Sequence, residues 1–95
     1  MKSIIQTKKE CFKCLSCYNL EEHHVFFGSA NRKLSEQDGL KVWLCYEHHR
    51  GTYGVHGRDG KKIDTYLKEQ AEQVWIVYYG KTEDDFRKRY GKNYL

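Results

Sequence analysis

Residues 40–49 read LKVWLCYEHH, and this stretch decides the fold. Its first half alternates apolar and polar side chains and contains β-branched and aromatic residues, which predicts a strand over Leu40–Cys45. A short helix is expected to follow the strand directly. Cys45 and His48 stand at this junction with the C-x-x-H spacing of a metal-ligand pair. The strand and the helix are therefore expected to meet at a bound metal ion.

A second pair of ligands lies far away along the chain, where Cys11 and Cys14 have C-x-x-C spacing. Zinc binds four thiolate or imidazole ligands in a tetrahedron, and two short-spaced pairs from distant segments provide such a set. The positive end of the helix that follows Cys45 also favours a thiolate. We therefore predict a structural zinc ion bound by Cys11, Cys14, Cys45 and His48. In the alternative interpretation the cysteines are small buried apolar residues.

Cys17 provides an alternative first pair, because Cys14 and Cys17 have the same spacing as Cys11 and Cys14. A strand must lead from the zinc site to His23, and Cys14 leaves eight residues for it whereas Cys17 leaves five. The longer connection favours the pair Cys11 and Cys14 and leaves Cys17 without a role.

The composition agrees with a small domain that a metal ion supports. The chain has 95 residues, of which 39% are hydrophobic and 32% are charged, so an aliphatic core is thin. Domains of this size often add a metal ion, disulfides or a partner subunit. The first residues lack the apolar segment of a signal peptide, and no stretch is long enough to span a membrane. We expect a cytoplasmic protein whose cysteines stay reduced and bind metal.

We expect one domain over 1–95, with a polar lead-in at 1–9, a core at 10–60 and a helical extension at 61–95. In the core, a first strand over Leu20–Phe27 pairs antiparallel with the second strand. The connection between them, Gly28 to Gly39, is expected to be a long polar loop that can hold a short helical turn at Ser35–Asp38. The short helix is expected over Tyr46–Arg50, ending at Gly51 or Gly54.

The extension is predicted to be helical, because apolar residues recur three and four positions apart from about 62 to 79, where Gly80 ends the pattern. Thr82, followed by three acidic residues, predicts the cap of a last helix that runs to about Tyr90. We expect both helices to pack around Trp75, Tyr78 and Phe86. The predicted fold class is α+β: a small zinc-stapled, treble-clef-like ββα finger with two additional C-terminal helices.

Four histidines remain once His48 is assigned to zinc: His23, His24, His49 and His56. A single histidine is usually a structural or surface residue, but four lie here within one strand–loop–strand–helix unit. Neighbouring residues of a strand face opposite sides, so His23 and His24 are expected to do two jobs, one as a metal ligand and one activating water. His49 and His56 are the further candidate ligands. Alternatively, the cluster binds zinc as a second structural site.

The order of motifs resembles the HNH (ββα-metal, or His-Me finger) endonucleases, in particular small proteins encoded by bacteriophages and prophages. The resemblance covers most of the chain from about residue 10. It is carried by the C-x-x-C pair, the run EHHV at 22–25, a polar connection, and the run LCYEHH at 44–49. It implies a divalent-metal-dependent nuclease that nicks or cleaves DNA in the cytoplasm of a bacterial host.

The resemblance also implies roles for single residues. His23, His49 and His56 take the places of ligands to a catalytic ion, either Mg²⁺, Mn²⁺ or another divalent ion. His24 takes the place of the general base, which suits a neutral imidazole near pH 7. The family's asparagine before the second strand is missing, since Leu40 stands there. Either Asn31, in the connection, or a backbone carbonyl is expected to orient His24 in its stead.

The net charge of +4 and the pI near 8.9 are compatible with a DNA partner. Four basic residues fall in segments expected around the site and are candidates to contact phosphates. They are Arg32, Lys33, Arg50 and Arg58. The alternative function is a non-catalytic zinc-finger module that binds DNA or a protein partner. Nothing in the sequence determines the oligomeric state.

Overall fold

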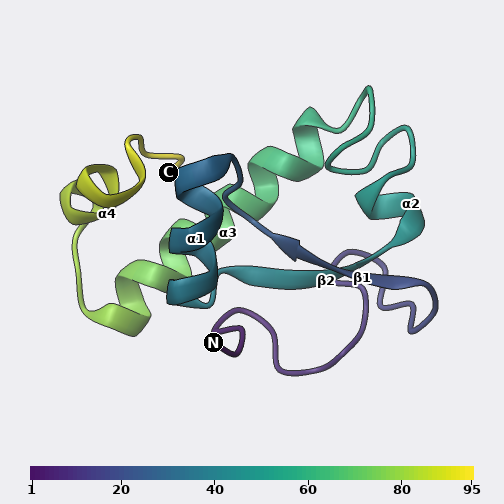
Figure 1. Cartoon of the computed structure of the whole chain (residues 1–95), viewed down its shortest axis with the longest axis horizontal. Helices are drawn as coiled ribbons and strands as arrows, with labels where there is room; N and C mark the ends of the chain where they lie inside the picture. The colour runs from purple at the N-terminus through teal and green to yellow at the C-terminus, as the bar shows by residue number, and fades with distance from the viewer.

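A computed structural model of the protein describes all of residues 1–95, and it has an α+β fold. A two-stranded hairpin lies at the centre, with α1 at one of its ends and α2 at the other (Figure 1). The longest helix, α3, runs diagonally above the hairpin in this view and passes behind α1, and α4 lies beyond α1 (Figure 1). The elements in chain order are β1 (Leu20–His24), α1 (Ser29–Asp38), β2 (Lys41–Cys45), α2 (Tyr46–His49), α3 (Lys61–Tyr79) and α4 (Glu83–Tyr90). The predicted fold class is confirmed.

The hairpin is antiparallel, and its register places His23 opposite Val42 and His24 opposite Lys41. Alternation along β1 buries His23 and leaves its neighbours partly or largely exposed. The first strand is shorter than predicted, because the backbone leaves the ladder after Val25. Val25 still donates to the Leu40 carbonyl, but the Phe26 amide donates to the Ser35 hydroxyl instead.

The connection between the strands was predicted as a loop with one helical turn, and this was wrong. It forms the ten-residue helix α1, whose buried residues are Ser35 and Asp38. Gly28 and Gly39 flank it at φ of +94° and +74°, a region that favours glycine. The segment has few apolar residues, so it shows no helical periodicity, although most of its residues are good helix formers. The helix is stabilised by polar contacts at its ends rather than by an apolar stripe.

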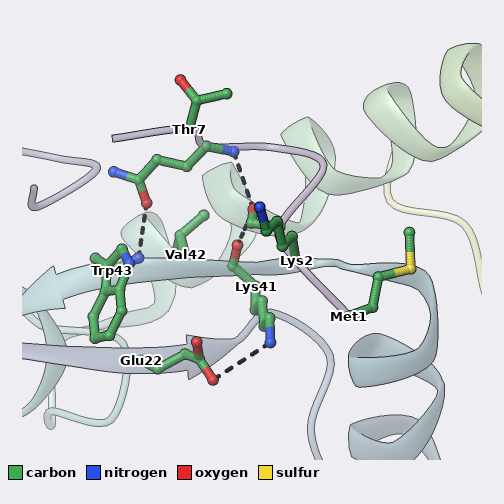
Figure 2. Close-up of a pocket in the computed structure, with 9 residues that line it drawn as sticks. Met1, Lys2, Thr7, Glu22, Lys41, Val42 and Trp43 are labelled. Carbon is green, nitrogen blue, oxygen red and sulfur yellow. Dashed lines mark hydrogen bonds and ion pairs between the residues drawn. The ribbon is translucent and has the colours of Figure 1, made fainter. Parts of the chain in front are cut away.

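The lead-in lies against the free edge of β2 (Figure 1). The Ile4 amide donates to the Gly39 carbonyl at 2.9 Å, the Ser3 hydroxyl donates to the Lys41 carbonyl, and the Trp43 amide donates to the Gln6 side chain. Between the lead-in and the strand runs a groove that Met1, Lys2, Thr7 and Trp43 help to line (Figure 2). These contacts cover an edge that would otherwise expose unpaired backbone groups.

The two C-terminal helices agree with the predicted pattern. Gly80 ends α3 at φ of +62°, and Thr82 begins α4 with a capping box to Asp85. Trp75 and Phe86 are buried as expected, with ring centroids 5.4 Å apart. Tyr78 was also predicted in this core, and this was wrong, since it is 59% exposed. The face of α3 that turns inward carries Trp75 and Tyr79, one helical turn apart, and this leaves Tyr78 outside.

Asp38, at the end of α1, joins this helix to α3 and α4. Its buried carboxylate accepts hydrogen bonds from the Trp75 indole at 2.9 Å and the Tyr90 hydroxyl at 2.7 Å. The Arg89 guanidinium binds both of its oxygens. A buried carboxylate is costly unless its oxygens are paired, and these donors provide the pairing.

No helix has the length and apolar character that a membrane span requires.

Candidate functional site

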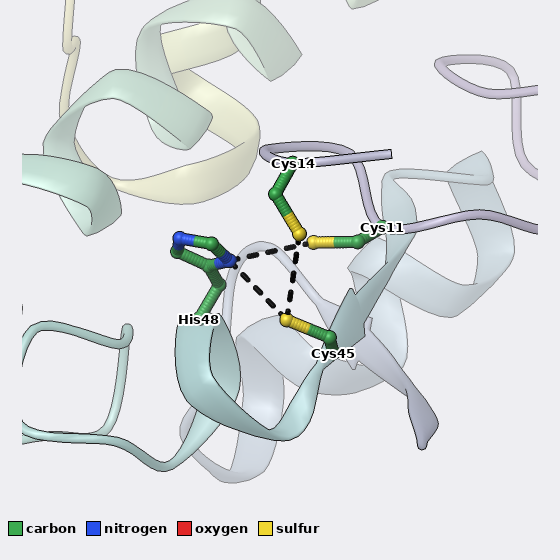
Figure 3. A group of neighbouring side chains, drawn as sticks. All are labelled: Cys11, Cys14, Cys45 and His48. Atoms are coloured by element: carbon green, nitrogen blue, oxygen red, sulfur yellow. Dashed lines mark hydrogen bonds between the residues drawn. The ribbon is translucent and has the colours of Figure 1, made fainter. Parts of the chain in front are cut away.

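Three thiols and one imidazole converge where the turn that carries Cys11 and Cys14 meets β2 and α2 (Figure 3). Cys14 Sγ lies 3.7 Å from Cys45 Sγ, Cys11 Sγ lies 3.7 Å from His48 Nδ1, and Cys45 Sγ lies 3.2 Å from the same nitrogen. Zinc bonds of about 2.3 Å to sulfur and 2.0 Å to nitrogen set tetrahedral ligand atoms roughly 3.5–3.8 Å apart. The four side chains fit a structural zinc site, as predicted.

A tight turn prepares the first ligand pair. The Cys11 amide donates to the Ser16 carbonyl, and the Leu15 amide donates to the Cys11 carbonyl, with Leu15 at φ of +68°. Burial acts to raise the pKa of the Cys11 thiol, but hydrogen bonds from the backbone of Cys45, Cys14 and Lys13 outweigh burial and lower this pKa to about 6. The turn therefore favours the thiolate that zinc requires.

Cys17 lies outside this cluster. It is exposed, and its Sγ is 4.0 Å from the Leu15 carbonyl oxygen. The structure thus assembles the Cys11 and Cys14 pair and not the alternative pair of Cys14 and Cys17.

A second cluster consists of His23 from β1, His49 from α2 and His56 from the loop after α2. One nitrogen of each lies within 4.8 Å of the others. The ring centroids are 5.2 Å apart for His23 and His49, 5.2 Å for His23 and His56, and 4.8 Å for His49 and His56. The structure brings these three predicted ligands together.

The loop over 51–60 places His56 by coiling tightly against α2. The Val55 amide donates to the His48 carbonyl, and the His56 amide donates to the His49 carbonyl. This coil requires glycine, because a Cβ at Gly57 would lie 1.9 Å from the Gly51 carbonyl oxygen, and one at Gly60 would lie 1.8 Å from that of Gly54. Glycine at positions 57 and 60 is therefore required to place His56 beside the other two histidines.

His23 is the strongest sign that this cluster suits a cation. It is 3% exposed, and its Nε2 is buried with no hydrogen-bond partner. Burial, together with the neighbouring imidazoles of His49 and His56, lowers the pKa of His23 to about 3. The ring is therefore neutral near pH 7, as a metal ligand must be. A bound cation would satisfy the unpartnered nitrogen, whose desolvation otherwise costs about 1–3 kcal/mol.

Glu21 supports the cluster by holding the imidazole of His49, a role that was not predicted from the sequence. Its Oε1 lies 2.7 Å from His49 Nδ1 and accepts from Arg50 Nε at 2.9 Å. Hydrogen bonds from His49 first, and then from Arg50, lower the pKa of the Glu21 carboxyl. A carboxylate on one ring nitrogen directs the other toward a metal ion. The available signal was position, since Glu21 lies two residues before His23 and so shares its face of β1.

His24 lies on the opposite face of β1, outside the three-histidine cluster. Its Nε2 is 2.8 Å from Glu36 Oε1, and the Lys41 ammonium contacts both oxygens of Glu36 at 3.1 Å. Asn31 is not its partner, since the Asn31 amide donates to the Tyr90 carbonyl at 3.4 Å. The difference arises because α1 is a helix, which turns Glu36 toward His24 and Asn31 toward α4.

The four basic candidates are dispersed. Arg50 is tied to the histidine cluster through Glu21. Arg32 and Lys33 are exposed on α1, and Arg58 is 83% exposed beside Asp59. Only Arg50 therefore has a contact that connects it to the site.

Comparisons of the chain with protein-family models, with curated proteins and with solved structures find no match. The two ligand clusters and the ββα unit that carries them are therefore the features from which a function can be inferred.

Proposed function

We propose that the protein is a divalent-metal-dependent endonuclease of the HNH type, which hydrolyses phosphodiester bonds in DNA. The observation that carries the proposal is the convergence of three imidazoles on one point, with a buried and unpartnered nitrogen on His23. The first cluster supports it as a scaffold, because Cys45 and His48 are joined directly to the helix that carries His49.

His23, His49 and His56 would hold the ion, and Glu21 would hold His49 in the orientation that binding needs. When bound, the ion supplies Lewis-acid stabilisation of the charge that develops on the phosphate. Imidazole donors suit zinc, nickel, copper or iron better than the hard Mg²⁺ ion. We therefore expect activity with Ni²⁺ or Co²⁺ to exceed activity with Mg²⁺. His56 is exposed, so the fourth position is open to a substrate.

His24 is proposed as the general base on the resemblance alone. Glu36 holds its imidazole at 2.8 Å. Because His24 is the last residue of β1 and faces away from the cluster, the scissile phosphate would have to reach it around the end of the strand. Arg50, beside the cluster, is the favoured phosphate contact among the four basic candidates.

The second candidate function is a non-catalytic module that binds DNA or a protein partner. One observation favours it: the imidazole proposed as the base is engaged by Glu36 and lies across β1 from the three-histidine cluster. In that case the cluster binds zinc only as a second structural site.

Supercoiled plasmid nicking separates the two functions. The zinc-loaded protein would be incubated with plasmid and Mg²⁺, Mn²⁺, Co²⁺ or Ni²⁺, alongside the variants His23→Ala and His24→Ala. The proposal expects nicking that both substitutions abolish, with metal loss only in His23→Ala. Absence of nicking with every metal, while DNA binding persists, would contradict the proposed nuclease activity and favour the binding module. Nicking that survives His24→Ala would reject only the base assignment.

A further inference from the structure

Lys68, on α3, has a partly buried ammonium with few partners. Its side chain is 16% exposed, and its Nζ donates to Asp64 Oδ2 at 2.9 Å. The same nitrogen lies 4.5 Å from the ring centroid of Phe27 and 5.6 Å from that of Tyr94. An ammonium has three donors, and Asp64 Oδ2 is the only hydrogen-bond acceptor that the Lys68 ammonium contacts.

Phe27 joins Lys68 to the histidine cluster. Its ring centroid is 5.9 Å from that of His23 and 5.3 Å from that of His56. α3 begins directly after the loop that carries His56, and Asp64 and Lys68 lie near the start of this helix.

The charged groups beside the cluster do not balance the positive charge that a bound divalent ion would add. The three imidazoles bring no negative charge, and Glu21 is paired with Arg50 and His49. Asp64 balances Lys68 through Oδ2, and its Oδ1 is buried without a hydrogen-bond partner. A divalent ion at the cluster would add two positive charges with no protein carboxylate among its ligands. Partly buried charge of this kind is stabilised by a counter-ion, and a phosphate group offers one.

We propose that Lys68 binds a non-bridging phosphate oxygen of a phosphodiester held at the three-histidine ion, and that Asp64 positions its ammonium. The inference rests on the proposed function for the ion site and names phosphodiesters as the group that Lys68 recognises. Asp64 Oδ2 fixes the lysine, while the two free donors of the ammonium remain for the substrate. Lysine serves as a point charge for phosphate in many sites.

The test uses the zinc-loaded full chain with Co²⁺ at the histidine cluster and a thymidine dinucleotide as the probe. Binding would be followed by calorimetry and by the visible absorption of Co²⁺. Lys68→Gln is expected to weaken dinucleotide binding about tenfold or more, since a charge-assisted hydrogen bond is lost, with Co²⁺ loading unchanged. Lys68→Arg should recover part of the loss. Lys88→Gln is the matched control, because Lys88 is 72% exposed on α4.

Wild-type affinity in a Co²⁺-loaded Lys68→Gln variant would overturn the inference, as would a wild-type protein that does not bind the dinucleotide. The nuclease proposal fails separately. Intact plasmid together with lysine-dependent dinucleotide binding rejects nicking and keeps the phosphate site. Nicking together with lysine-independent binding keeps the nuclease and rejects the role of Lys68.

Discussion

Glu21 Oε1 lies 2.7 Å from His49 Nδ1, so a carboxylate on β1 holds a candidate metal ligand on α2. The contact crosses 28 positions of the chain and joins the strand to the helix beside the histidine cluster. It selects the orientation in which the other nitrogen of His49 faces His23 and His56. The geometry of the ion site therefore depends on a residue that is not itself a ligand.

Glu21→Gln is expected to weaken metal binding at the three-histidine cluster by about 10–100-fold, the usual effect of losing such a partner. Calorimetric titration of the zinc-loaded protein with Ni²⁺ or Co²⁺ measures it. Glu22→Gln is the matched control, because Glu22 is the next residue and contacts Lys41 on the other face. Equal metal affinities in wild type and Glu21→Gln would show that His49 needs no support.

Cys11→Ser is expected to abolish zinc binding and with it the cooperative thermal transition. Structural zinc contributes about 10 kcal/mol or more of folding free energy in small domains, and this chain has a thin core. Metal analysis and circular dichroism measure both effects, and a strong chelator should reproduce them in the wild type. Cys17→Ser serves as the control, since Cys17 is exposed and outside the cluster. A similar loss in Cys17→Ser would contradict the assignment of the four ligands.

Gly57→Ala is expected to displace the loop that carries His56. The added Cβ would lie 1.9 Å from the Gly51 carbonyl oxygen, so the backbone must shift. We expect a loss of Co²⁺ binding at the histidine cluster while the structural zinc is retained. Tyr53→Ala tests the same loop at a side chain that is 73% exposed, and it should bind both metals normally. Normal Co²⁺ binding in Gly57→Ala would mean that His56 does not depend on the tight coil.

Asp38→Ala is expected to destabilise the fold by about 3 kcal/mol, because it leaves the buried donors of Trp75 and Tyr90 and the Arg89 charge without their acceptor. Chemical denaturation of the zinc-loaded protein measures the free energy of unfolding. Asp84→Ala provides the comparison, since Asp84 pairs with Arg87 and Lys88 at the surface and such pairs contribute little. Similar losses in the two variants would contradict the role of Asp38 as the joint between α1 and the C-terminal helices.

Local patterns in the sequence were sufficient for several elements. The C-x-x-C and C-x-x-H spacings identified Cys11, Cys14, Cys45 and His48, because short spacings place two ligand atoms on one turn. The ends of α3 and α4 followed from Gly80 and Thr82, since caps are interactions within a few residues. The second strand of the hairpin followed from its apolar–polar alternation and its β-branched and aromatic residues.

Tertiary structure decided the rest of the site. That α1 is a helix, that Tyr78 is exposed, and that Glu36 rather than Asn31 binds His24 all depend on contacts between segments far apart in the chain. The roles of Glu21 and Lys68 have the same origin. The sequence by itself determined which side chains were available to bind metal, because that depends on residue type and short spacing. Only the packing of β1, α2 and the loop over 51–60 brought His23, His49 and His56 together and left His24 apart. The direction in which a side chain points and the depth of its burial are properties of the assembled fold.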